Sequence, residues 1–212
     1  YLENGKVTGI SVDIAREMMK MTGITGEIEV VPWARAYTQA LTRENVMIFT
    51  MARTEEREDK FNWIGKVGEK KMYFFKLKSR KDIELKSVEA AKRYMTGVVN
   101  NDVSEMELLK RGFKHGENLD KAVTEDVNVR KFFSKRVDLL LGAEEDTMYL
   151  CKKLKYSYSE IQRLNVIVYD GEYYIAFSKE TSEEIVEKFR RAFSELQKNG
   201  FYSKIRDKYL EK

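Results

Sequence analysis

The sequence is poor in proline, cysteine and histidine, and it lacks long apolar runs. A single cysteine, Cys151, excludes an intrachain disulfide and a cysteine-rich metal cluster. The only histidine, His115, lies in the turn-like stretch "FKHGEN", which favours a surface residue over a general base. No apolar run approaches the roughly 20 residues that a membrane helix needs.

Motifs that carry nucleotide binding or hydrolysis are also absent. The sequence contains no GxGxxG, GxxxxGK[ST], GxSxG or HExxH. The acidic run Glu144–Asp146 is typical of a solvated helix N-terminus, which is a simpler reading than an acid–base pair. The sequence therefore favours ligand recognition over catalysis, and it predicts no cofactor and no metal site.

Composition indicates a folded protein with a well-solvated surface. The 212 residues suit one large domain or two small lobes, and 42% hydrophobic residues suffice for a substantial core. The net charge of +4 comes from basic and acidic residues that are mixed along the chain. Without a basic block this charge argues against a nucleic-acid surface, while a modest positive bias suits a small anionic ligand.

Helices and strands are predicted to alternate, which indicates an α/β fold with mainly parallel sheets. Apolar spacing and cap residues predict helices near residues 10–22, 33–43, 102–113, 145–154 and 181–210, the last broken at Gly200, and a helix with a polar break over 118–137. β-Branched and apolar runs predict strands at 26–32, 46–52, 70–79, 96–101, 138–144, 163–170 and 172–179.

Five motifs occur in one order along nearly the whole chain: "GKVTGISVDIAREM", "RTEEREDKFNWIG", "GVVNNDVSEMELLKRG", "KRVDLLLGAEE" and "YYIAFSKET". In this order they resemble the extracytoplasmic solute-binding proteins of amino-acid-type ABC transporters. The resemblance implies a type II periplasmic-binding-protein fold, in which two α/β lobes joined by two crossing strands close on a solute by hinge motion. Lobe one would comprise residues 1–74 and 171–212, and lobe two residues 75–170. The family's usual first strand of lobe one, ahead of "YLENGK", is missing, so we expect that it was removed or lies outside this sequence.

For lobe one the resemblance assigns ligand contacts to the end of a strand and the turn that follows. Arg57, three residues after Thr54, matches the arginine that grips the α-carboxylate of the ligand, and a guanidinium fork meets a carboxylate bidentately. Arg53 is a second cation for a further acidic group. Thr50 and Ala52 lie on the strand end, where Ala52 replaces a residue that usually bears a hydroxyl.

The stretch "VVPWARAYTQAL" (residues 30–41) places Pro32, Trp33 and Arg35 where a predicted strand meets a predicted helix. Proline suits the first turn of a helix, so Pro32 ends the strand and opens the helix. The simplest interpretation of Trp33 is that it packs under that helix. In the family, a ring at this junction stacks on the ligand. The resemblance therefore makes Trp33 a candidate wall of the binding site, with Arg35 beside it.

In lobe two the sequence departs from the family pattern at two places. Asn101 and Asp102 stand where glycine and threonine are usual, at a helix start whose free N–H groups favour an anion. Asp102 either faces the ligand, which would repel a carboxylate, or acts as an N-cap. Ala143 stands where an aspartate usually binds the α-ammonium, so either Glu144 replaces that aspartate or no ammonium is bound.

The resemblance implies extracytoplasmic binding of a small solute, an amino acid or a related carboxylate-bearing metabolite, for delivery to a membrane ABC permease. The alternative is the ligand-binding sensor domain of a membrane signalling receptor, and a remote alternative is an enzyme of the same fold, such as a dehydratase. We expect a monomer without nucleic-acid partners, periplasmic or otherwise extracytoplasmic, with its signal peptide removed and with or without a membrane anchor.

Overall fold

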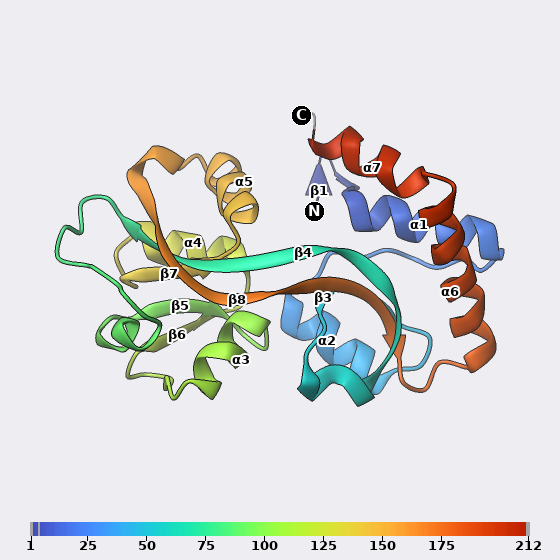
Figure 1. The fold of residues 1–212 in the computed structure, drawn as a ribbon, viewed down its shortest axis with the longest axis horizontal. Helices are drawn as coiled ribbons and strands as arrows, with labels where there is room; N and C mark the ends of the chain where they lie inside the picture. The colour runs from blue at the N-terminus through green and yellow to red at the C-terminus, as the bar shows by residue number, and fades with distance from the viewer. Residues whose placement is uncertain (1, 4, 211–212) are drawn as a thin grey trace. The chain divides into compact units, whose positions relative to one another are not determined.

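The computed structural model describes residues 2–3 and 5–210; Tyr1, Asn4, Glu211 and Lys212, which the predicted lobe one includes, lie outside the described residues. Figure 1 shows the arrangement. The strands are β1 (Leu2–Glu3), β2 (Lys6–Val7), β3 (Met47–Ala52), β4 (Phe61–Leu77), β5 (Thr96–Val99), β6 (Leu119–Ala122), β7 (Leu139–Gly142) and β8 (Ile161–Ser178). The α-helices are α1 (Ile10–Thr22), α2 (Trp33–Thr42), α3 (Val103–Lys110), α4 (Glu125–Phe133), α5 (Glu144–Leu154), α6 (Glu183–Lys198) and α7 (Phe201–Leu210). Short 3-10 helices are η1 (Glu55–Lys60), η2 (Glu89–Arg93) and η3 (Tyr158–Glu160).

Six of these strands form one sheet in the order β3-β8-β4-β7-β5-β6. β3 pairs antiparallel with β8, and β4 pairs antiparallel with β7. β5 pairs parallel with both β6 and β7. The sheet is therefore mixed, whereas the sequence predicts mainly parallel strands. The difference comes from the two long strands, because β8 is antiparallel to β3 and β4 is antiparallel to β7.

The chain divides into two compact units. Unit 1 comprises residues 1–31, 35–68 and 172–212, and unit 2 comprises residues 32–34 and 69–171. Each long strand changes unit at a Gly-Glu step, Gly68–Glu69 in β4 and Gly171–Glu172 in β8. The lobes predicted from the sequence, with boundaries at 74/75 and 170/171, are defined by the ligand that they would enclose. These boundaries stay a prediction.

Unit 1 has a core built on three helices, α1, α6 and α7, which pack against one another (Figure 1). The apolar face of α1 contributes Ile14 and Met18, and Gly23 ends the helix in the left-handed conformation that a glycine cap permits. The buried residues of this core are Ile14, Met18, Val67, Ile175, Phe177, Val186, Phe189, Ala192, Phe193 and Leu196.

Unit 2 packs α4 on β5, β6 and β7, with α5 beside α4, and α3 against β5. In Figure 1, α4 and α5 lie on one side of these strands and α3 lies on the other. Side-chain caps start two of the helices, because Asp102 accepts from Ser104 N and Thr124 accepts from Val127 N. The buried core residues are Phe75, Leu77, Val129, Phe132, Val137, Leu140, Leu150, Cys151 and Ile161.

The strand predicted over residues 26–32 is wrong, because no regular element forms there. β-Branched residues favour an extended backbone, yet a strand is stable only when a neighbour pairs with its N–H and C=O groups. Among the described residues, β3 is an edge of the sheet, and no strand lies beyond it. Val30 is accordingly 50% exposed.

Three further segments differ from the sequence prediction. Residues 118–137, predicted as an interrupted helix, form the strand β6 and the helix α4, and the polar break at Thr124 is the cap between them. The strands predicted at 163–170 and 172–179 are one continuous strand, β8. β4 starts at Phe61, well before residue 70, because its pairing overrides the two glycines that interrupt the apolar pattern.

Gly65 in β4 leaves room for a ring of the unit 1 core, which gives a test of this packing. A Cβ at Gly65 would lie 2.1 Å from Cε1 of Phe193, a residue only 4% exposed. We expect Gly65→Ala to lower the free energy of unfolding by about 2–3 kcal/mol through overpacking, measured by urea denaturation.

Gly68→Ala is the matched control on the same strand, since a Cβ there meets no heavy atom within 4 Å. We expect its stability to stay within about 0.5 kcal/mol of wild type. A Gly65→Ala protein as stable as Gly68→Ala would contradict the packing of Phe193 against β4.

Candidate functional site

In unit 1, the predicted site residues gather where β3 ends. Thr50 has a φ of 61°, in the left-handed region, and the pairing of β3 with β8 shifts register at this point. Such a conformation is an outlier for a β-branched residue and commonly marks a functional strand end. Thr50 Oγ1 donates to Ser11 Oγ at the start of α1 over 3.0 Å. Ala52 is buried, and its carbonyl faces the following turn.

Arg57 lies inside unit 1 as one of its largest fully buried side chains, at 0% exposure. η1 carries it back toward the strand end, so that Nη1 donates to Ala52 O over 3.1 Å. The guanidinium also lies 4.9 Å from the ring centroid of Tyr37. Thr54 precedes η1, and among the described residues its buried Oγ1 has no hydrogen-bond partner. Arg57 N donates to Thr54 O over 2.9 Å, so the buried cation and the residue with the unused hydroxyl share one turn, and their role toward a ligand stays a prediction.

Arg53 has a different environment, since it is held by Glu58. Its Nε donates to Glu58 Oε2 over 2.7 Å, and a second bond joins Nη2 to Oε1. The guanidinium lies 5.1 Å from the Trp63 ring and 5.2 Å from the Tyr174 ring. The hydrogen bonds to Glu58 raise the pKa of Arg53, so this cation is already engaged within the protein.

The two candidates at the start of α2 are placed differently. Arg35 is exposed. Trp33 groups with unit 2, and its indole Nε1 donates to Asn101 O over 2.8 Å. Two predicted site residues, distant in sequence, are thus joined by a hydrogen bond.

Asn101 and Asp102 form the turn between β5 and α3. Asn101 has a φ of 60°, a left-handed conformation that asparagine adopts more readily than most residues. Asp102 is the N-cap of α3, because its Oδ2 accepts from Ser104 N over 3.2 Å. The same carboxylate lies 3.6 Å from the ammonium of Lys70 on β4. Asp102 therefore caps the helix and contacts a buried cation at once.

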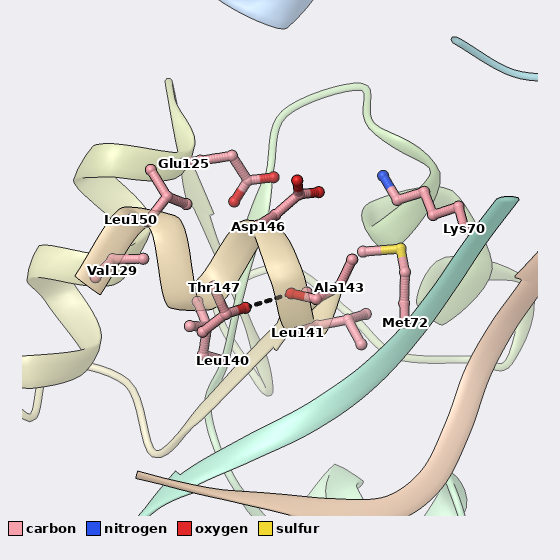
Figure 2. A pocket seen from close by; sticks show the side chains of 11 residues that line it. Lys70, Met72, Glu125, Val129, Leu140, Leu141, Ala143, Asp146, Thr147 and Leu150 are labelled. Atoms are coloured by element: carbon pink, nitrogen blue, oxygen red, sulfur yellow. Dashed lines mark hydrogen bonds between the residues drawn. The ribbon is translucent and has the colours of Figure 1, made fainter. Parts of the chain in front are cut away.

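A small cavity in unit 2 lies beside this ion pair. Its volume is about 10 Å³, room for about one water molecule. Figure 2 shows the carboxylates of Glu125 and Asp146 and the ammonium of Lys70 around it. The lining residues are Lys70, Met72, Glu125, Val129, Leu140, Leu141, Gly142, Ala143, Asp146, Thr147 and Leu150.

Acidic groups outnumber cations around this cavity, which alters their titration. Burial raises the pKa of Glu125 to about 8, with repulsion from Asp102 and Asp146 adding to it and Lys70 opposing it. Partial desolvation beside the cavity raises the pKa of Asp146, Lys70 opposes this shift, and the carboxylates of Glu145 and Asp102 add to it. The raised pKa favours the protonated form of Glu125, whose carboxyl group is able to donate as well as accept.

Ala143 and Glu144 begin α5 at the end of β7. Ala143 is buried, and its carbonyl accepts from Thr147 Oγ1 over 2.6 Å, the bond drawn in Figure 2. Glu144 accepts from Tyr158 over 3.0 Å and from Arg163, and it is not among the residues that line the cavity. Burial and the bond to Glu144 raise the pKa of Tyr158 to about 12.

Sequence reasoning missed Lys70, Glu125 and Asp146 as possible site residues. Glu125 and Asp146 follow the ends of β6 and β7, the two strands that flank β5, so their position after strand ends is a signal that the sequence carries. Lys70 has no such signal, because its burial depends on the register of β4. Among the described residues, no group of three or more acidic, histidine or cysteine side chains is placed to hold a metal ion.

A comparison with models of protein families identifies one family. All 212 residues match the model of the bacterial extracellular solute-binding proteins, family 3. No curated protein sequence matches the chain.

Several solved structures share the fold. A histidine kinase sensor domain with similarity to periplasmic binding proteins gives a TM-score of 0.85 at 17% identity, covering 99% of this chain and 89% of that one. The arginine-, lysine-, histidine-binding protein ArtJ from the thermophilic bacterium Geobacillus stearothermophilus gives 0.83 at 20% identity, covering 100% and 90%. An ancestral arginine-binding protein bound to arginine gives 0.82 at 24% identity, covering 98% and 90%. At these identities the likeness concerns the fold.

The pKa of Glu125 predicts how stability depends on pH. Between its ordinary value of 4.5 and about 8, the folded protein keeps a proton that the unfolded chain has lost. The contribution of Glu125 to stability is therefore complete at low pH and is lost as the pH rises through this window. Glutamine stays neutral, so we expect Glu125→Gln to gain about 1–3 kcal/mol over wild type near pH 9 and nothing near pH 4, measured by urea denaturation.

Glu145→Gln removes an exposed carboxylate from the same helix start as Asp146 and serves as the control. Its stability relative to wild type is expected to stay flat across the same pH range. A flat profile for Glu125→Gln as well would show that Glu125 titrates normally.

Proposed function

Because the chain belongs to the bacterial extracellular solute-binding proteins of family 3, we propose that it binds an amino acid or a related carboxylate-bearing metabolite and delivers it to an ABC permease. The predicted family and α/β periplasmic-binding-protein fold are confirmed by the family match and the similar solved structures. Solved neighbours named for binding arginine, lysine and histidine support an amino acid as the solute class.

The observation that carries this proposal is the turn Thr54–Arg57. A guanidinium at 0% exposure has lost its hydration, and its contacts include the Ala52 carbonyl and the Tyr37 ring. A solute carboxylate suits the guanidinium fork bidentately, and the buried Thr54 hydroxyl is able to donate to the same anion. Thr50 and Ala52 stand at the strand end beside this turn.

The ammonium of an amino acid needs a carboxylate, and the proposal assigns this role to a residue other than Ala143 or Glu144. Glu144 is engaged by Tyr158 and Arg163. Asp146 lies in the same first turn of α5 and lines the cavity together with Glu125. Asp146 therefore supports an ammonium-bearing solute better than Glu144 does.

The remaining predicted residues enter the proposal unequally. Trp33 offers a ring for stacking on a solute, close to Asn101 and Asp102. Arg35 is exposed and stays a candidate. Arg53 supports the site indirectly, since Glu58 already binds its guanidinium. Binding by hinge closure, with β4 and β8 as the crossing strands, is part of the same proposal.

The second candidate function is a sensor domain of a membrane signalling receptor. A histidine kinase sensor domain is among the similar solved structures, which supports it. No helix within the described residues is both long and apolar enough to cross a membrane. We propose an extracytoplasmic, monomeric protein that binds without catalysis, whose partner is a permease or, in the second case, a fused signalling module.

A thermal-shift screen tests the proposed function. We expect one or more amino acids, among L-arginine, L-lysine, L-histidine, L-glutamine and L-glutamate, to raise the melting temperature. A solute at 100 times its Kd stabilises the folded protein by about 2.7 kcal/mol. Small carboxylates, peptides and polyamines complete the panel. Stabilisation by polyamines alone would contradict a carboxylate-bearing solute.

Arg57→Lys is expected to weaken binding of the screened solute by about 10- to 100-fold, because lysine keeps the charge and loses the fork. Isothermal titration measures the Kd. The control Arg191→Lys changes an exposed arginine on α6 and is expected to bind as wild type does. Unchanged affinity in a folded Arg57→Lys protein would remove Arg57 from the site.

Trp33 fluorescence reports on the predicted wall of the site. In a Trp63→Phe background Trp33 is the sole tryptophan, and we expect its emission to shift when the screened solute is added. The converse variant, Trp33→Phe, leaves only Trp63, which lies at 9% exposure and donates to Glu58 O. A solute-dependent signal from Trp63 together with silence from Trp33 would place Trp33 outside the site.

A further inference from the structure

The turn between β5 and α3 carries two groups of the proposed site, and its backbone is held in an uncommon conformation. Asp102 N donates to Val99 O over 3.1 Å, which closes the turn around Asn101. The φ of 60° at Asn101 is a left-handed conformation, which persists only where surrounding contacts fix it.

Glu105 supplies that contact from the first turn of α3. Its Oε2 accepts from Asn101 N over 2.6 Å, and the residue is only 4% exposed. This resembles a capping box, in which a glutamate three residues after the N-cap reaches back to the chain before the helix. Here Asp102 is the N-cap, and the glutamate reaches one residue further, to the left-handed Asn101.

The other oxygen of Glu105 is held from a different part of unit 2. His115 Nε2 lies 3.0 Å from Oε1, and Lys121 Nζ lies 3.9 Å from it. A buried carboxylate is costly unless such donors satisfy it. Contacts on both oxygens therefore fix the Glu105 side chain in one place, and through it the position of Asn101.

Two further groups contact this turn, Trp33 at Asn101 and Lys70 at Asp102. Asn101 O accepts from Trp33 Nε1 over 2.8 Å. Asp102 pairs with Lys70, which lines the cavity with Glu125 and Asp146. The Asn101 carbonyl that accepts from Trp33 shares its peptide plane with Asp102 N, which is held by Val99 O, while the bond to Glu105 holds the peptide plane on the other side of Asn101. The two bonds together fix the left-handed Asn101, and the bond to Glu105 is the one that a side chain supplies.

We propose that Glu105, supported by His115, is a positioning residue that sets the orientation of Trp33 through the turn at Asn101. Its importance for solute binding rests on the proposed function, in which Trp33 is a wall of the site. The positioning itself requires no solute, so it is measured on the protein alone.

The test uses the indole N–H resonances of the two tryptophans in ¹⁵N-labelled protein, assigned with Trp33→Phe. In Glu105→Ala we expect the Trp33 indole resonance to shift and its hydrogen exchange to speed up about five- to tenfold, since its acceptor is no longer held. The Trp63 indole, which donates to Glu58 O, serves as an internal control and is expected to stay unchanged.

Two matched variants separate positioning from a general loss of structure. Glu105→Gln keeps an oxygen that is able to accept from Asn101 N, and we expect it to restore the Trp33 resonance toward wild type. Glu107→Ala removes a carboxylate from the same helix that pairs with Lys110, and it is expected to leave both indoles unchanged.

An unshifted Trp33 indole in Glu105→Ala would overturn the proposal, and so would equal shifts of both indoles. Failure of every amino acid in the thermal-shift screen would contradict the proposed function and leave this result intact. The two proposals therefore fail separately.

Discussion

The pairing of β8 with β4 is the interaction on which the sheet depends, because every other strand reaches the six-stranded sheet through one of these two. β3 pairs only with β8 among the described strands, and β7 attaches to β4 and carries β5 and β6 with it. Both long strands contribute residues to both units. The chain is therefore joined by hydrogen-bonded backbone in place of a flexible linker, as a Pro-poor sequence without a Gly/Ser-rich spacer leads one to expect.

The sequence predicts those elements whose signals are local. The amphipathic spacing of α1 and its glycine cap, or the break at Gly200 between α6 and α7, depend on residues within a few turns. Elements that depend on a distant partner are predicted less well. Residues 26–32 have the β-branching of a strand and form none, because no neighbouring strand pairs with them, while β6 is a strand despite its charged residues, because β5 lies beside it.

The candidate site shows the same difference between local features, which the sequence predicts, and contacts with distant residues, which it does not. Thr54 and Arg57 lie three residues apart, so a single turn holds both: Arg57 N donates to Thr54 O, and the guanidinium reaches Ala52 O at the end of β3. The sequence pattern does not predict which side chains pair with one another in the folded protein. Arg53 and Glu144 look available in the sequence, yet Glu58 and Arg163 engage them. Glu105 looks like a helix-start residue, and only the folded chain shows that it faces His115.

Both units keep charge in places where a core of this size would be more stable with apolar residues. Arg57 is wholly buried in unit 1, and in unit 2 the carboxylates near Lys70 crowd together until burial and repulsion favour a protonated Glu125. Buried charge of this kind is costly unless its contacts satisfy it, and those contacts include Ala52 O for Arg57 and the Asp102 carboxylate for Lys70. Both features are of the kind that clusters at ligand sites, so the role of Arg57 and the role of the Glu125–Asp146 cluster in binding a solute are separate proposals, one for each unit.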